Sequence, residues 1–185
     1  NSMRDEPINI HNIMGTYGDL RDSRYRGFNQ GTAEYVSFVD PDDTVIPGIF
    51  DKCVDVLDAN PTICGVYTTS NIIKEVDGTD RIVGMIHPYR QWKRSKKPAL
   101  LEIHQLTVMR RGITIQTFDD EYDNIPRMLP TELWLYWAMA VKAPWFAIDA
   151  VGYNWRKTEY GVHNSNTPEI LADIKRTYEF IKKSW

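Results

Sequence analysis

The chain has 185 residues, of which 42% are hydrophobic and 25% are charged, which suits one domain over residues 1–185. Its 22 basic and 25 acidic side chains give a formal net charge of −3, which excludes an overall positive field for gathering nucleic acid or anionic membrane. The sequence has neither an apolar run of about 18 residues nor a signal-peptide pattern. We therefore expect a cytoplasmic protein without membrane insertion, with Cys53 and Cys64 reduced in the core.

Hydrophobic patterning in the first third predicts strands that alternate with helices. Ile8 to Ile13 is typical of a short strand, and Leu20 to Gln30 of a helix that Asp19 caps. The apolar run Tyr35 to Val39, which ends at a group of acids, predicts a strand buried on both faces of a mainly parallel sheet. A helix opened by Pro47 should follow, because apolar residues recur there at helical spacing.

The rest of the chain continues the alternation. Strand-type sequence runs from Ile63 to Val76 and ends in the turn Asp77-Gly78. Residues 89–97 are basic and aromatic without apolar periodicity, which predicts a flexible loop. The remaining expected elements are a strand from Leu100 to Met109, a helix from Thr131 with the inward stripe Leu133, Trp134, Trp137, Ala138 and Val141, short strands Phe146 to Ile148 and Val151 to Trp155, and a helix from Pro168 to Lys183 capped by Thr167. The order predicts an α/β domain whose ligand lies beyond the carboxyl ends of its strands.

An acidic run follows the apolar stretch at Tyr35 to Val39. Asp40, Asp42 and Asp43 are clustered anions that repel one another, and a bound divalent cation would relieve that repulsion. Carboxylate oxygens suit Mg²⁺ or Mn²⁺, which also bridge to phosphates. The alternative is that Asp40 to Asp43 is only a turn that caps the next helix.

The stretch from Ser23 to Pro47 resembles family 2 glycosyltransferases. In that family a helix with an Ala-Arg-Asn-x-Gly type motif leads to an apolar strand and then to an Asp-x-Asp motif, and here Ser23-Arg24-Tyr25-Arg26-Gly27 is followed by Tyr35 to Val39 and the acidic run. The resemblance implies a GT-A-like (Rossmann-like) fold, with Arg24 near the nucleotide diphosphate and Asp40, Asp42 and Asp43 at the donor and its metal. Without the resemblance, Arg24 could simply pair with Asp19 or Asp22 on the helix surface.

Two later segments extend the resemblance. Thr131-Glu132-Leu133-Trp134-Leu135 is similar to the region that supplies the catalytic base, which makes Glu132 the candidate base; otherwise Glu132 only favours its helix start. Tyr153 to Ser165 is similar to a late Tyr-Arg-x-His-x-x-Ser region. It implies His163 as a third metal ligand beside Asp40 and Asp42, and Arg156 could meet phosphate oxygens.

The family normally begins with two further strands that contact the donor base, and nothing here resembles them. We therefore expect an N-terminally incomplete domain, with an oligomer or a second chain supplying the missing strands. The predicted function is a metal-dependent, inverting transferase that moves a sugar from a nucleotide-diphosphate donor to a hydroxyl of a glycan, a small molecule or a modified nucleic acid. The alternative is a non-catalytic module that binds nucleotide sugars or glycans.

Overall fold

The computed structural model describes residues 19–87, 103, 105–127, 131–158 and 167–183. The helices are α1 (Leu20–Asn29), α2 (Ile49–Ala59), α3 (Arg111–Glu121), α4 (Thr131–Lys142) and α5 (Pro168–Lys183). The strands are β1 (Tyr35–Val36), β2 (Thr44–Val45), β3 (Gly65–Val76), β4 (Thr79–Ile86), β5 (Thr107–Arg110) and β6 (Trp145–Arg156). The strand predicted at residues 8–13, the loop at residues 89–97 and His163 lie outside the described residues.

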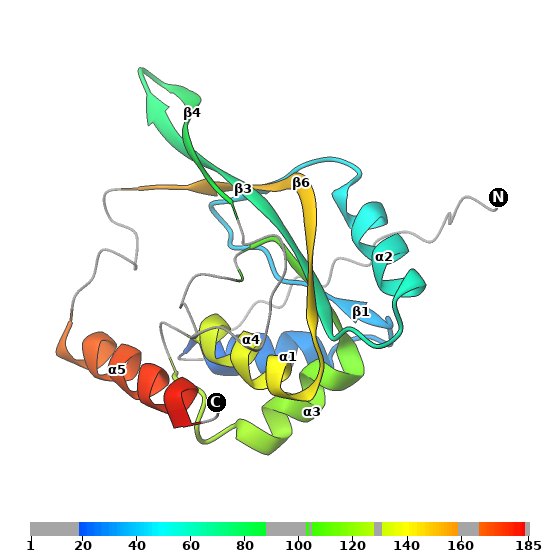
Figure 1. The fold of residues 1–185 in the computed structure, drawn as a ribbon. Coiled ribbons are helices and arrows are strands. Elements are labelled where there is room, and N and C mark those ends of the chain that lie inside the picture. Colours follow the sequence, from blue (N-terminus) through cyan, green and yellow to red (C-terminus); the bar gives the residue numbers. More distant parts are fainter. Residues whose placement is uncertain (1–18, 88–102, 104, 128–130, 159–166, 184–185) are drawn as a thin grey trace.

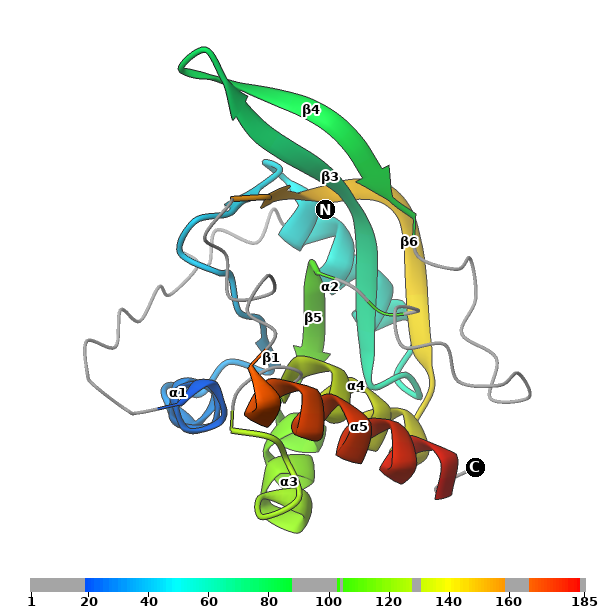
Figure 2. The same ribbon diagram turned by 90° about the vertical axis from the view of Figure 1, so that its left-hand side faces the viewer.

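A single mixed sheet organises the described part of the chain. Its strand order is β1-β5-β3-β6-β2, and β4 pairs with β3 as a hairpin. Figure 1 shows the long strands β3 and β6 with helices around them, and Figure 2 shows the β3–β4 hairpin extending beyond the helices. The predicted α/β class, with a mixed sheet flanked by helices, is confirmed.

The predicted strand directions are partly wrong. Only β3 and β6 run parallel, while every other pairing among the described strands is antiparallel. The run Tyr35 to Val39 forms a strand only at Tyr35–Val36, at one end of the sheet. Beyond the strand, Phe38 packs on Phe28 of α1 and Tyr136 of α4, with ring centroids 6.3 and 6.5 Å apart, while Val39 is 42% exposed, so the run is not a strand buried on both faces.

Two core clusters lie on opposite faces of the sheet. Neighbouring residues of β3, Val66 and Tyr67, belong to different clusters, as do Val108 and Met109 of β5, and successive strand residues point to opposite faces. We call the α2 side the aliphatic face and the α1, α3 and α4 side the aromatic face. The aliphatic face contains Ile49, Cys53, Leu57, Ile63, Val66, Leu106, Val108 and Tyr153. The aromatic face includes Phe28, Tyr67, Phe118, Trp134, Tyr136, Trp137 and Trp145.

Most predicted helices are confirmed by the contacts that define their ends. Asp19 accepts a hydrogen bond from the Asp22 N–H at 2.7 Å and so caps α1. The N-cap of α2 is Gly48, with a φ of +75° that glycine adopts readily, so this helix begins after Pro47. On α4, Trp134 and Trp137 of the predicted inward stripe are buried, but Val141 is 42% exposed.

Five further elements, among them the unpredicted strand β2, differ from the sequence prediction. The two short strands predicted near the C-terminus are one strand, β6, from Trp145 to Arg156. The predicted strand from Leu100 to Met109 is seen as β5, Thr107–Arg110, and residues 100–102 lie outside the described part. Helix α3 and strand β4 were not predicted. The turn Asp77-Gly78 has positive φ at both residues, 54° and 73°, which matches a tight hairpin turn leading directly into β4.

Candidate active site

The acidic run forms a tight turn after β1. The Asp43 N–H donates to the Asp40 carbonyl at 3.1 Å, which closes a four-residue turn with Pro41 at a position that proline favours. The turn leads into β2 and not directly into a helix, so the alternative that it caps the next helix is wrong. The Asp40 N–H also donates to the buried Tyr153 hydroxyl at 3.2 Å, which anchors the turn to β6.

Arg24 joins the acidic turn to the predicted catalytic base. Its Nη1 donates to Glu132 Oε2 at 2.6 Å, across 108 positions of sequence, and its Nη2 lies 3.8 Å from Asp40 Oδ1. The guanidinium stacks over the Phe38 ring at 4.2 Å, and only 8% of the side chain is exposed. Arg24 thus holds two predicted site acids together, and the alternative that it pairs with Asp19 or Asp22 is wrong.

The charges in this group are set by burial and by each other. Burial alone would lower the pKa of Arg24, but the charge and hydrogen bond of Glu132 outweigh it, so the net shift is upward. Burial raises the pKa of Asp40, while Arg24 and the Gln105 side chain oppose that rise. Arg24 is therefore a fixed cation between two carboxyl groups. The arrangement can hold an anionic group or orient a proton acceptor.

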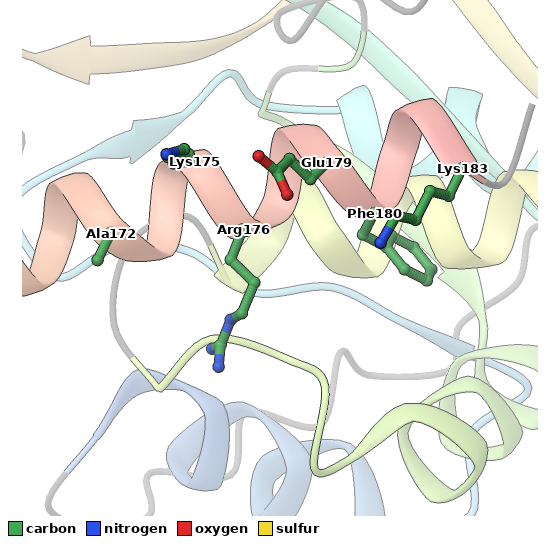
Figure 3. Close-up of a pocket in the computed structure, with 6 residues that line it drawn as sticks. All are labelled: Ala172, Lys175, Arg176, Glu179, Phe180 and Lys183. Atoms are coloured by element: carbon green, nitrogen blue, oxygen red, sulfur yellow. The ribbon is translucent and has the colours of Figure 1, made fainter.

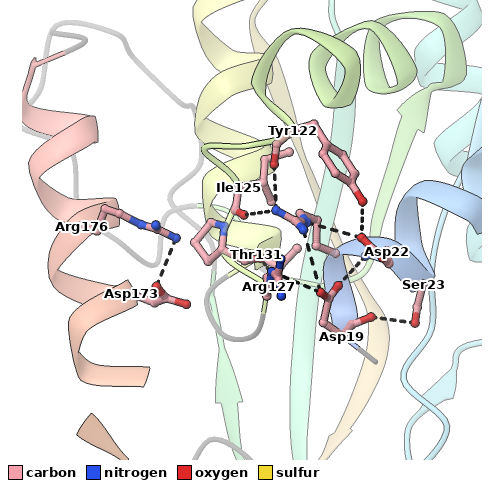
Figure 4. Close-up of polar contacts among 11 residues, drawn as sticks. Asp19, Asp22, Ser23, Tyr122, Ile125, Arg127, Thr131, Asp173 and Arg176 are labelled. Atoms are coloured by element: carbon pink, nitrogen blue, oxygen red, sulfur yellow. Dashed lines mark hydrogen bonds and ion pairs between the residues drawn. The ribbon is translucent and has the colours of Figure 1, made fainter. Parts of the chain in front are cut away.

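Helix α1 is also tied, next to this group, to the segment from Tyr122 to Arg127 that follows α3. The main-chain N–H groups of Leu20 and Arg21 donate to the Arg127 carbonyl at 2.9 and 3.2 Å. The Arg21 guanidinium donates to the Tyr122 carbonyl at 3.1 Å and lies over the Tyr122 ring at 4.3 Å. Figure 4 shows Asp19, Asp22, Tyr122 and Arg127 gathered at this junction. The junction fixes the helix that carries Arg24 beside the segment that leads to Glu132.

Gln105 is a site residue that the sequence prediction missed. Its Nε2 donates to Asp40 Oδ2 at 3.2 Å, and the side chain is buried. It lies just before β5, and Asp40 follows β1, which pairs with β5, so its proximity to Asp40 depends on sheet pairing. No local signal in the sequence marks it.

Arg156 lies beside the acidic turn but does not reach the Arg24 group. Its main-chain N–H donates to Asp43 Oδ1 at 2.6 Å and its Nε donates to the Asp42 carbonyl at 2.9 Å. Its two Nη atoms form a bidentate pair with Asp80 of β4, at 2.5 and 2.6 Å. The hydrogen bonds of this pair raise the pKa of Arg156 and lower that of Asp80. The predicted phosphate contact of Arg156 stays a prediction.

The described residues do not form a metal site by themselves. No three His, Cys, Asp or Glu side chains among them lie close enough together to hold a metal ion. Asp42 is exposed. Burial raises the pKa of Asp43, while the Arg156 N–H and the Tyr153 hydroxyl oppose that rise. The buried Oδ2 atom of Asp43 has no hydrogen-bond partner among the described residues. Mg²⁺ commonly takes one or two carboxylates plus phosphates and waters, so the residues present fit a cation shared with a diphosphate.

Among the described residues, those that line a separate hollow of about 420 Å³ all belong to α5. Figure 3 shows its lining residues along this helix: Ala172, Lys175, Arg176, Glu179, Phe180 and Lys183. None of them is a candidate site residue, and the lining comes from one helix face, so the hollow is not part of the candidate site. None of the helices in the described ranges has both the length and the apolar character needed to span a bilayer.

Comparison with known proteins finds likeness in structure but not in sequence. No protein-family model matches the chain, and no curated protein matches it. The structure is similar to S. aureus TarS 1–349, a glycosyltransferase, in complex with UDP-GlcNAc: the TM-score is 0.55 at 14% identity, covering 87% of this chain and 45% of TarS. A second TarS 1–349 structure gives 0.50 at 16% identity, covering 90% and 53%.

This chain therefore spans about half the length of the TarS chain. At such low identity the likeness establishes a glycosyltransferase-like fold and no particular family. It confirms the fold predicted from the region Ser23 to Pro47.

Proposed function

We propose that this chain forms the core of a metal-dependent glycosyltransferase that moves a sugar from a nucleotide-diphosphate donor to a hydroxyl acceptor. The observation that carries the proposal is the convergence of Asp40 and Glu132 on Arg24. These two acids were assigned to the donor and the acceptor sides from separate parts of the sequence. The fold likeness to TarS, whose structure holds UDP-GlcNAc, supports the same class of donor.

Glu132 is the proposed catalytic base. It has 26% of its side chain exposed and it accepts a hydrogen bond from Arg24, which orients the carboxylate. Glu132 takes the proton of the acceptor hydroxyl, and the hydroxyl oxygen bonds to the anomeric carbon. The bond from that carbon to the diphosphate oxygen breaks, and the diphosphate leaves with the electron pair. Attack opposite the leaving group inverts the anomeric configuration.

The acidic turn is the proposed donor site. Asp42, with Asp40 and His163, would hold Mn²⁺ or Mg²⁺, which supplies positive charge to the leaving diphosphate. Arg24 and the hydrogen bond from Gln105 hold the Asp40 carboxylate in place. Asp43 is fixed by the Arg156 N–H, so its contribution is to keep the turn in the conformation that presents Asp42.

The test measures release of free nucleotide diphosphate from UDP-GlcNAc, and then from other nucleotide sugars, with and without Mn²⁺. We expect Mn²⁺-dependent release that falls by at least about 100-fold in Glu132→Gln, because a positioned general base contributes about 10²–10⁴-fold. Asp42→Asn should also lower nucleotide release, because the site would bind Mn²⁺ less tightly. Asp55→Asn, which changes an exposed acid on α2, is the matched control and should leave release unchanged.

The same experiment separates a non-catalytic binding module from an enzyme. The ion pair between Glu132 and Arg24 is the feature that favours the module, since it occupies one oxygen of the proposed base. Mn²⁺-dependent binding of UDP without release from any nucleotide sugar would establish the module and reject the transferase. Absence of both binding and release would reject the donor site itself.

A further inference from the structure

Arg156 connects the acidic turn to the β3–β4 hairpin. Its Nε fixes the Asp42 carbonyl at 2.9 Å, and its main-chain N–H fixes the Asp43 carboxylate at 2.6 Å. The other side of the guanidinium meets both oxygens of Asp80 at 2.5 and 2.6 Å, across 76 positions of sequence. One planar group therefore bridges two parts of the chain that share no strand pairing.

The hairpin holds Asp80 in a defined place. Asp80 pairs with Glu75 in the β3–β4 register, directly after the turn Asp77-Gly78. On its other side, β3 pairs with β6 up to Ile73↔Arg156, so Arg156 lies beside the middle of the hairpin, where Ile73 pairs with Ile82. The carboxylate is thus presented by backbone pairing on one strand to a guanidinium on another.

The ion pair between Arg156 and Asp80 affects the position of the guanidinium more than the stability of the fold. Arg156 and Asp80 keep 25% and 45% of their side chains exposed, and exposed ion pairs contribute little to folding. A bidentate pair, however, fixes the plane of the guanidinium, and that plane sets where Nε meets Asp42. Because Asp80 occupies the outer nitrogens, Arg156 could bind a phosphate through that edge only by releasing Asp80.

We propose that Asp80 is a positioning residue for the donor site, which holds the Arg156 guanidinium so that its Nε keeps the Asp42 carbonyl, and with it the acidic turn, in the conformation that binds the donor. The inference rests on the proposed function. It reverses the expected role of Arg156, which supports the turn and does not contact the phosphate. It also gives the hairpin a role in donor binding, through a residue that no sequence motif marks.

Two variants test the proposal through UDP binding in the presence of Mn²⁺, measured by calorimetry, and through kcat and KM for UDP-GlcNAc. Asp80→Asn removes the anion but keeps the side-chain shape, and Arg156→Lys keeps the charge but loses the planar fork. Both should weaken UDP binding and raise KM by about 10-fold, the lower end of the effect of removing a supporting residue at a metal site. kcat and the thermal midpoint should change little. Glu75→Gln is the control, since it removes the neighbouring charge and leaves the fork.

The outcomes separate this inference from the proposed function. If Asp80→Asn tightens UDP binding while Arg156→Lys weakens it, Arg156 contacts the phosphate itself and the positioning role is wrong. Unchanged binding in both variants, beside a loss in Asp42→Asn, also overturns the positioning role and leaves the transferase proposal standing. Failure of the unaltered chain to bind UDP with Mn²⁺ overturns both.

Discussion

The acidic turn is held on two sides by different physical means. On the aromatic face, Arg24 is almost fully buried over Phe38 and contacts both Asp40 and Glu132. On the β6 side, Tyr153 of the aliphatic face and the partly exposed Arg156 hold the backbone and the carboxylate of the turn. The same short segment is therefore fixed on one side by buried charge and on the other by main-chain hydrogen bonds.

The difference predicts which residues govern stability and which govern ligand binding. A buried guanidinium cannot lose its partners without leaving a charge poorly solvated, so changes there affect folding as well as function. Exposed groups exchange their partners for water at little cost in folding free energy. Their loss should appear mainly in the affinity for the donor. Four variants or measurements can break or sharpen this contrast.

The largest effect is expected from Arg24→Met on the aromatic face. The change leaves Glu132 and Asp40 without their shared cation, and breaking a buried pair costs about 3–5 kcal/mol. Because those acids keep 26% and 40% exposure, we expect about 2–4 kcal/mol less stability in urea unfolding. Nucleotide release should also fall to background. Lys52→Met, at an exposed site on α2, should change neither quantity, and an unaltered urea midpoint in Arg24→Met would reject the contrast.

A second change tests how tightly the aliphatic face is packed under β6. A Cβ at Gly152 would lie 2.4 Å from Thr68 Oγ1 and 2.8 Å from Ile49 Cγ1, so Gly152→Ala should cost about 1–3 kcal/mol through overpacking. Gly112→Ala in α3 meets nothing within 4 Å and should raise stability by up to about 1 kcal/mol, because alanine favours the helix. Opposite shifts in the thermal midpoint are the expected result. Equal shifts would contradict the packing argument.

Local sequence signals predicted the elements that periodicity defines. The helices α1, α2, α4 and α5 follow their apolar spacing, and the cap at Asp19 follows from side-chain chemistry. Helix α3 was missed because Ile113, Thr114, Ile115 and Thr117 are β-branched residues that favour strands. Its helical form depends on tertiary packing, in which Thr114, Thr117 and Phe118 are buried.

The candidate site was predictable only where a motif marked it. Arg24, Asp40 and Glu132 were named from sequence, and the structure brings them together. Gln105 and Asp80 were not, because Gln105 reaches Asp40, and Asp80 reaches Arg156, through strand pairing that no local pattern encodes. The apolar run before the acids also misled the prediction of strand direction, since a helix can cover such a run as well as a neighbouring strand can.

A third, smaller effect is expected from Tyr153→Phe. The ring is fully buried in the aliphatic face and its hydroxyl accepts the Asp40 N–H at 3.2 Å. Removing the hydroxyl keeps the packing but leaves that N–H without its partner, which costs about 1–2 kcal/mol. Urea unfolding measures this cost, and calorimetry with UDP and Mn²⁺ should show weaker binding, because the turn loses an anchor. A loss of stability without any change in UDP binding would show that Tyr153 has only a structural role.

The smallest effect, close to none, is expected when the native thiols are treated with a thiol reagent. Cys53 lies in the aliphatic cluster and Cys64 in the aromatic cluster, and both are buried without a disulfide. Burial raises the pKa of Cys53 to about 12 and raises that of Cys64 as well. The thiolate is the reactive form, so raising the pH from about 7 to about 9, which ionises ordinary cysteines, should not speed labelling of the folded chain.

Denaturant should expose both cysteines, and mass spectrometry can show which of them is labelled first. Because the Cys64 Sγ donates to the Ala143 carbonyl at 3.1 Å, while the described residues give the Cys53 thiol apolar packing alone, Cys53 should be labelled first as denaturant rises. Labelling of Cys64 first would mean that the aromatic face, with its buried charges, opens more easily than the aliphatic one, against the contrast drawn here.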